Sequence, residues 1–289
     1  MTTSRRPVVV GVLDKQPHAL RFALREAVRA GTSLRVVHSA GLPTQAVEFY
    51  ISADVYADVH RAGEEILDDA RHLVAEEPSA PEVTYVLATT PPVVALEHEA
   101  EGAALLVVGV DDSGWFERLL GSDVTAHVAR HVACPVVVVP ERDYPGSGTG
   151  DVVAAIDGDT SAAAVLRFAF DQADRRGGVL RVLHATPPGT LRADAEAIRA
   201  NIGEVLAGWG ESYPDVRVLT SLTIDDVEGA CAKAAQDADL VVVGRPHARS
   251  ASFALARPLA AQILRRASCP VAVVPVDHDP GWATGVPRG

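Results

Sequence analysis

Short apolar runs alternate with segments of helical period along the whole chain. The first helical segment of each half has apolar residues three and four positions apart: Leu20, Ala23, Leu24, Ala27 and Leu166, Ala169, Phe170, Ala173. The apolar runs predict strands at 7–13, 34–39, 83–88, 105–109 and 136–140, and at 152–156, 180–185, 216–220, 240–244 and 271–275. This alternation is typical of βαβ units, in which helices cover both faces of a parallel sheet. We therefore predict an α/β protein with five parallel strands in each half.

The second half of the chain repeats the first. The tract 34–38 (LRVVH) returns at 180–184 as LRVLH, an offset of 146 residues, whereas Cys134-Pro135-Val136 returns as Cys269-Pro270-Val271, an offset of 135. The first half is therefore 11 residues longer, within the stretch from Gly41 to about Pro92. Two interpretations of the extra residues are open, a lid beside the sheet edge or a longer helix pair with aromatic residues such as Tyr56 packed beneath it, and we favour the second.

The repeat predicts two domains joined by a linker. The stretch 144–150 is rich in Gly, Ser and Pro and has no apolar period, as in flexible linkers. We assign residues 1–143 to the first domain, 144–150 to the linker, 151–277 to the second domain and 278–289 to a C-terminal tail. Because tandem copies can imitate a twofold dimer, we expect an intramolecular pseudo-dimer, with a homodimer as a further option.

Charge and cysteine content narrow the partners and the compartment. The 289 residues include 26 Lys and Arg against 38 Asp and Glu, a net charge of −12, which opposes binding to nucleic acid and to anionic membranes. The three cysteines form no CxxC pair, and no apolar run is long enough for a signal peptide or a membrane span. We expect a cytoplasmic protein.

The carboxyl ends of the strands are where a sheet of this kind binds ligands. After the predicted strand 105–109 the chain runs to Gly121-Ser122, which opens a predicted helix that ends at about Ala133. A glycine at a helix N-terminus lets a phosphate reach the free backbone N–H groups. Alternatively, Ser122 is only a helix cap and Gly121 only a turn residue. The residues alone leave both interpretations open.

The tract from Gly114-Trp115-Phe116 through 119–122 (LLGS) to 133–139 (ACPVVVV), together with 152–158 (VVAAIDG), resembles the universal stress protein family in its tandem form. The resemblance implies Rossmann-like domains with strand order 3-2-1-4-5, frequent dimerisation and a role in stress survival through an unknown protein partner. Family members that bind ATP carry a loop of Gly, two residues, Gly, nine residues and Gly-Ser or Gly-Thr. They also have an Asp at the end of the first strand and a backbone contact to adenine after the His that ends the second strand.

Carried over to the first half, the nucleotide-binding residues are Asp14, Ser39, Gly109, Gly121 and Ser122. Asp112 stands where the second glycine of the loop belongs, and Mg²⁺ would offset its charge beside a triphosphate. The second half keeps only Asp157, Ala185 and Gly244. Arg257-Pro258 replaces its Gly-Ser, so we expect a degenerate second site in which the arginine fills the phosphate space.

The resemblance therefore implies a regulator that binds an adenine nucleotide, ATP, in its N-terminal domain. We expect no enzymatic activity beyond, at most, weak ATP hydrolysis, no catalytic residues and no metal site of the protein's own. The alternative is a nucleotide-independent scaffold in which both sites have decayed. His38 and His184, which end equivalent strands, are expected to make hydrogen bonds that stabilise turns, and Cys134 and Cys269 to be buried.

Overall fold

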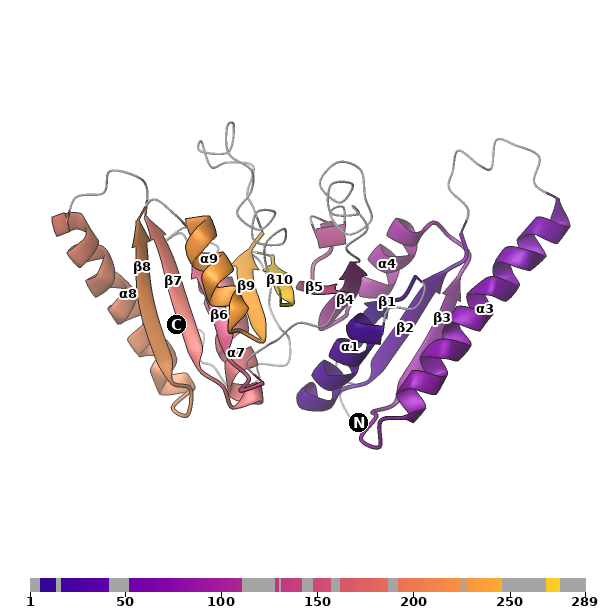
Figure 1. The fold of residues 1–289 in the computed structure, drawn as a ribbon, viewed down its shortest axis with the longest axis horizontal. Coiled ribbons are helices and arrows are strands. Elements are labelled where there is room, and N and C mark those ends of the chain that lie inside the picture. The colour runs from indigo at the N-terminus through magenta and orange to yellow at the C-terminus, as the bar shows by residue number, and fades with distance from the viewer. Residues whose placement is uncertain are drawn as a thin grey trace. The chain divides into compact units, whose positions relative to one another are not determined.

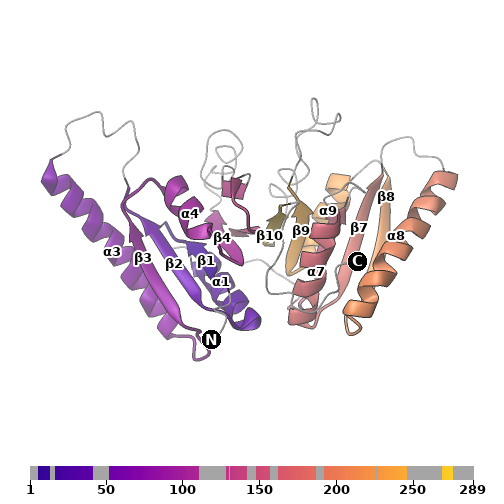
Figure 2. The same ribbon diagram turned by 180° about the vertical axis from the view of Figure 1, so that it is seen from behind.

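The computed structural model describes residues 6–13, 17–41, 52–110, 128–129, 131–141, 148–156, 162–186, 192–224, 227–245 and 269–275. Internal contacts divide the chain into two compact units, and the division falls between Asp143 and Tyr144. Each unit is built from a parallel sheet with helices on its faces (Figures 1 and 2).

Unit 1 contains a sheet of parallel strands in the order β3-β2-β1-β4-β5. The strands are β1 (Val8–Gly11), β2 (Leu34–Ser39), β3 (Val83–Ala88), β4 (Leu105–Val110) and β5 (Val136–Pro140). The helices are α1 (Pro17–Ala30), α3 (Ala53–Ala75) and α4 (Pro92–Ala100). Helices α1 and α3 pack against each other, and right-handed crossovers place α4 on the opposite face of the sheet (Figures 1 and 2).

Unit 2 has the same architecture, with parallel strands in the order β8-β7-β6-β9-β10. The strands are β6 (Val152–Ile156), β7 (Leu180–Thr186), β8 (Val218–Ile224), β9 (Leu240–Gly244) and β10 (Val271–Val274). The helices are α7 (Ala162–Arg176), α8 (Arg192–Ser212) and α9 (Val227–Gln236). Both units therefore have the predicted order 3-2-1-4-5, which confirms the α/β fold class.

The central strands lie in the core of each unit, as is typical of parallel sheets in α/β proteins. Every residue of β4, β5 and β6 is buried, and so are the eight apolar residues of α1 and α7 whose spacing predicted amphipathic helices. Cys134 and Cys269 are buried free thiols, as predicted. Burial raises the pKa of Cys269 to about 12, and the negative charge of Asp239 adds to the rise. At neutral pH this thiol is therefore an inert part of the core.

The last residues of the predicted linker are attached to unit 2. The backbone N–H groups of Gly148 and Gly150 donate to the two carboxylate oxygens of Asp239, at 3.1 and 2.7 Å. Gly150 has a φ of +83°, and a Cβ at Gly178 would lie 2.1 Å from its carbonyl oxygen. Gly150 therefore suits the left-handed backbone, and only a glycine at position 178 permits the close approach of the two segments.

Two sequence-based expectations need correction. Strand β8 begins at Val218 and ends at Ile224, later than the predicted 216–220. Helix α3 has 23 residues against 21 in α8, so helix length explains little of the 11-residue excess, and Tyr56 is 49% exposed instead of packed beneath the helix. Most of the excess lies between β2 and α3, and its residues 42–51 lie outside the described ranges.

Among the described residues, no helix is both long and apolar enough to cross a bilayer.

Candidate functional site

The end of β1 is the point at which the strand order of unit 1 reverses. Gly11, the last residue of β1, is opposite Val37 of β2 and Val108 of β4. Both neighbouring strands continue for two more residues, to Ser39 and Val110. The space beyond Gly11 is therefore bordered on either side by the ends of β2 and β4, which is the usual ligand position in an open α/β sheet.

His38 fixes the chain as it leaves β1. Its Nδ1 lies 2.8 Å from the carbonyl oxygen of Val12, and the side chain is only 7% exposed. An imidazole that donates through Nδ1 to this oxygen satisfies both buried groups. The predicted structural role of His38 is confirmed.

Ser39 follows His38 at the same edge and holds the next turn. Its hydroxyl donates to the carbonyl oxygen of Thr90 at 2.7 Å and accepts from the N–H of Gly41 at 3.2 Å. The N–H of Ala40 donates to Ala88 of β3 at 2.9 Å. Since successive N–H groups of a strand point to opposite neighbours, the N–H of Ser39 points to the β1 side, where β1 has already ended. This orientation suits the backbone contact that the sequence predicts at Ser39.

Gly41 allows two backbone segments to approach closely beside Ser39. A Cβ on Gly41 would lie 2.1 Å from the carbonyl oxygen of Thr90 and 2.6 Å from the nitrogen of Pro91. Any other residue at this position must push the two segments apart. This requirement has no signal in the sequence, because nothing near Gly41 in the chain reveals the contact with Thr90.

Gly109 lies on the other border of the space beyond β1. Gly109 follows Val108 in β4, so it lies one residue beyond the end of β1, and it is opposite Val139 of β5. The structure thus brings Ser39 and Gly109 to the same edge, on the two strands that flank β1. Asp14, Gly121 and Ser122 lie outside the described residues.

The equivalent edge of unit 2 has the same arrangement. Ala185 of β7 follows His184, which is opposite Ile156, and Gly244 of β9 follows Val243, which is opposite Ala155. Asp157 lies outside the described residues.

Glu141 joins the end of β5 to the start of α1, a contact that the sequence did not predict. Its carboxylate accepts from the N–H groups of His18 and Ala19, at 3.1 and 2.9 Å, and its own N–H donates to Val110 at 2.7 Å. A carboxylate at a helix N-terminus satisfies open N–H groups and the positive end of the helix dipole. Because more than 120 residues separate the partners, no local pattern reveals the contact; its one sequence signal is an acidic residue directly after a buried strand.

Comparison with known proteins decides the family. The family model described as "Universal stress protein family" matches residues 4–140 and again residues 149–275. The chain is a tandem universal stress protein.

Its relatives agree with this assignment. A universal stress protein of Mycobacterium tuberculosis strain H37Rv is 30% identical over 257 residues, which cover 82% of this chain and 85% of the relative. The crystal structure of a universal stress protein from Archaeoglobus fulgidus covers 92% of this chain and 95% of its own, with a TM-score of 0.70 at 19% identity, and shows the same fold. A shorter universal stress protein from Archaeoglobus fulgidus, solved in complex with dAMP, covers 47% of this chain and 98% of its own, at 25% identity and a TM-score of 0.35.

Proposed function

We propose that this universal stress protein binds ATP at the end of β1 in unit 1 and acts as a non-enzymatic regulator. In this proposal the bound nucleotide changes the surface around the edge of the sheet, and the change alters association with a protein partner. The observation that carries the proposal is the position of Ser39 and Gly109 on the two strands that flank the end of β1.

The two residues offer different parts of a nucleotide site. The N–H of Ser39 points to the space beyond β1, where it can donate to a ring nitrogen of adenine. Gly109 has no Cβ, so a ligand can approach the backbone of β4 closely. The following segment carries Gly121 and Ser122, for which we propose contacts with the phosphates.

Charge sets a condition on this binding. The protein carries a net charge of −12, and Asp112 lies in the proposed phosphate loop. A triphosphate would be repelled by these charges. We therefore expect ATP to bind as its Mg²⁺ complex and to bind more weakly when Mg²⁺ is chelated.

Calorimetric titration of the full chain tests the proposal. We expect one ATP per chain for the wild type and loss of binding for Gly121→Val, because the added side chain obstructs the approach of phosphate to backbone N–H groups. Arg257→Ala, at the corresponding position of unit 2, is the matched control and should leave the affinity unchanged. Circular dichroism establishes that each variant is folded.

Three results would count against the proposal. If folded Gly121→Val binds ATP as tightly as the wild type, the site has been placed wrongly. If Arg257→Ala alone abolishes binding, the nucleotide binds in unit 2. If freshly purified protein releases no adenine nucleotide on denaturation and shows no affinity for ATP, a nucleotide-independent scaffold replaces the proposed regulator.

A further inference from the structure

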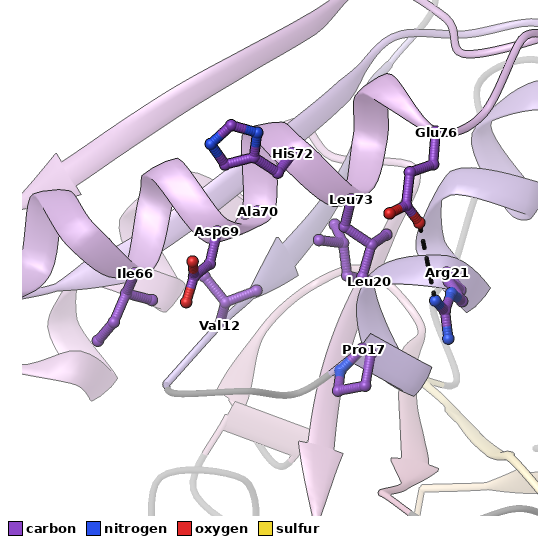
Figure 3. Close-up of a pocket in the computed structure, with 10 residues that line it drawn as sticks. All are labelled: Val12, Pro17, Leu20, Arg21, Ile66, Asp69, Ala70, His72, Leu73 and Glu76. Carbon is purple, nitrogen blue, oxygen red and sulfur yellow. Dashed lines mark ion pairs between the residues drawn. The ribbon is translucent and has the colours of Figure 1, made fainter.

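A cavity of about 360 Å³ lies between α1 and α3 of unit 1 (Figure 3). This volume is within the range of small-molecule sites, roughly 300–1,000 Å³. Apolar side chains provide one part of its lining: Val12, Pro17, Leu20, Ile66, Ala70 and Leu73. Charged or titratable side chains provide the rest: Arg21, Asp69, His72 and Glu76. The combination suits a ligand with a flat apolar body and a polar edge.

Arg21 is held only weakly at this cavity. Its Nη2 lies 4.0 Å from a carboxylate oxygen of Glu76 (Figure 3), and the two side chains are 51% and 73% exposed. Exposed ion pairs at this distance contribute little energy. The guanidinium group is therefore able to turn toward a molecule in the cavity at little cost.

The repeat shows what lies beside the equivalent arginine in unit 2. Arg167 corresponds to Arg21, because 166–169 (LRFA) repeats 20–23 (LRFA). The guanidinium carbon of Arg167 lies 6.0 Å from the centroid of the Trp209 ring. That ring stacks on Phe170 with centroids 5.7 Å apart, and the ring of Tyr213 stacks on Phe170 at 5.4 Å. In unit 2, aromatic rings from α8 and the residue after it thus pack next to the arginine.

Among the described residues that line the cavity of unit 1, none is Phe, Trp or Tyr. Unit 1 thus has a cavity beside Arg21, whereas unit 2 has the ring of Trp209 beside the equivalent Arg167.

We infer that the cavity between α1 and α3 binds a small, uncharged, planar aromatic molecule of the indole type. Its ring lies next to Arg21 as the ring of Trp209 lies next to Arg167, where cation–π attraction favours an electron-rich ring. Asp69 and Glu76 can accept a hydrogen bond from a ring N–H and would repel a phosphate or carboxylate group on the ligand. The inferred ligand is thus distinct from the nucleotide proposed for the end of β1.

Titration of the full chain with indole tests this inference. Methyl-labelled protein is followed by NMR, so that the shifts of Leu20, Ile66 and Leu73 report binding in the cavity. We expect saturable binding at one site and shifts at these three residues. Arg21→Gln removes the cation and should weaken indole binding about 2- to 5-fold. Leu73→Trp fills the cavity with a ring of the protein's own and should abolish binding.

Two controls separate this site from the rest of the protein. Arg167→Gln changes the equivalent arginine of unit 2 and should leave the affinity for indole unchanged, and saturating Mg²⁺–ATP should not displace indole. The inference is overturned if indole does not saturate at millimolar concentration or if Arg21→Gln binds it as tightly as the wild type. It is equally overturned if ATP displaces indole, which would place the ring at the end of β1.

Discussion

The close approach of Gly41 to Thr90 predicts a large effect of a single methyl group. In Gly41→Ala the new Cβ would lie 2.1 Å from the carbonyl oxygen of Thr90, against 3.4 Å for an ordinary contact. The two segments must therefore separate by about 1.3 Å. A movement of this size breaks the hydrogen bonds that the Ser39 hydroxyl makes with Thr90 and Gly41.

The opposing contributions have different magnitudes. Loss of two hydrogen bonds costs about 1–3 kcal/mol, and crowding against backbone costs about 1–3 kcal/mol more. Replacement of glycine by alanine restricts the unfolded chain and returns only about 0.4–1 kcal/mol. We expect a net loss of about 1–6 kcal/mol in the local stability of the β2 end, together with weaker ATP binding because Ser39 is displaced.

Hydrogen exchange of the full chain measures this loss, because the two units need not unfold in one step. Protection should fall in peptides that cover 34–41 and 83–91 and remain in unit 2. Gly203→Ala is the matched control: no atom lies within 4 Å of its added Cβ, and helix propensity should stabilise α8 by up to about 1 kcal/mol. If Gly41→Ala leaves both protection and ATP affinity intact, the two segments do not approach as closely as described.

Three further predictions concern stability. Glu141→Gln should lower the free energy of unfolding by about 0.5–2 kcal/mol and speed amide exchange at the start of α1. The control Glu65→Gln, on the exposed face of α3, should do neither, and equal exchange in both variants would contradict the contact. Asp151→Ala removes the partner of Arg181 (2.8 Å) and the acceptor for the N–H of Val179 (3.2 Å). The free energy of unfolding in urea should fall by about 2–3 kcal/mol, which is less than for a fully buried ion pair because Arg181 is 34% exposed. Because the pKa of Cys269 is raised to about 12, its contribution to stability should be complete below pH 9 and fall by up to about 1.4 kcal/mol per pH unit above it. The free energy of unfolding of Cys269→Ala should therefore depend less on pH between 9 and 10.5 than that of the wild type. Identical pH dependence in the two proteins would exclude Cys269 as the cause.

The sequence predicts the fold well because buried parallel strands leave a strong local signal. Runs such as 136–140 and 152–156 are apolar throughout and are bounded by polar residues, so their predicted limits agree with β5 and β6. Strand β8 was placed less accurately because its residues are largely exposed or only partly buried, and no apolar run marks its end. Burial is not the sole requirement, because β3 is only partly buried and its predicted limits, 83–88, are nonetheless correct.

The candidate site could be predicted only in part. The sequence points to His38 and Ser39 because both stand at the end of a recognisable strand, and the hydrogen bond of His38 confirms its structural role. Gly41 and Glu141 were not found, because their roles depend on Thr90 and on the start of α1, which are distant in sequence. Contacts of this kind form when the sheet assembles, and they leave little or no local pattern in the sequence.

The similarity of β5 and β10 has a consequence for how the protein reaches its native state. Both strands follow Cys-Pro. Their sequences are VVVVP and VAVV, and they pair with the similar strands β4 and β9. During refolding of the full-length chain each strand can therefore dock beside the wrong partner with little loss of hydrophobic burial. Synthesis from the N-terminus avoids this competition, because the first copy can fold before the second leaves the ribosome. Dilution from denaturant removes that order, so the refolding yield should be lower for the whole chain than for its first half alone.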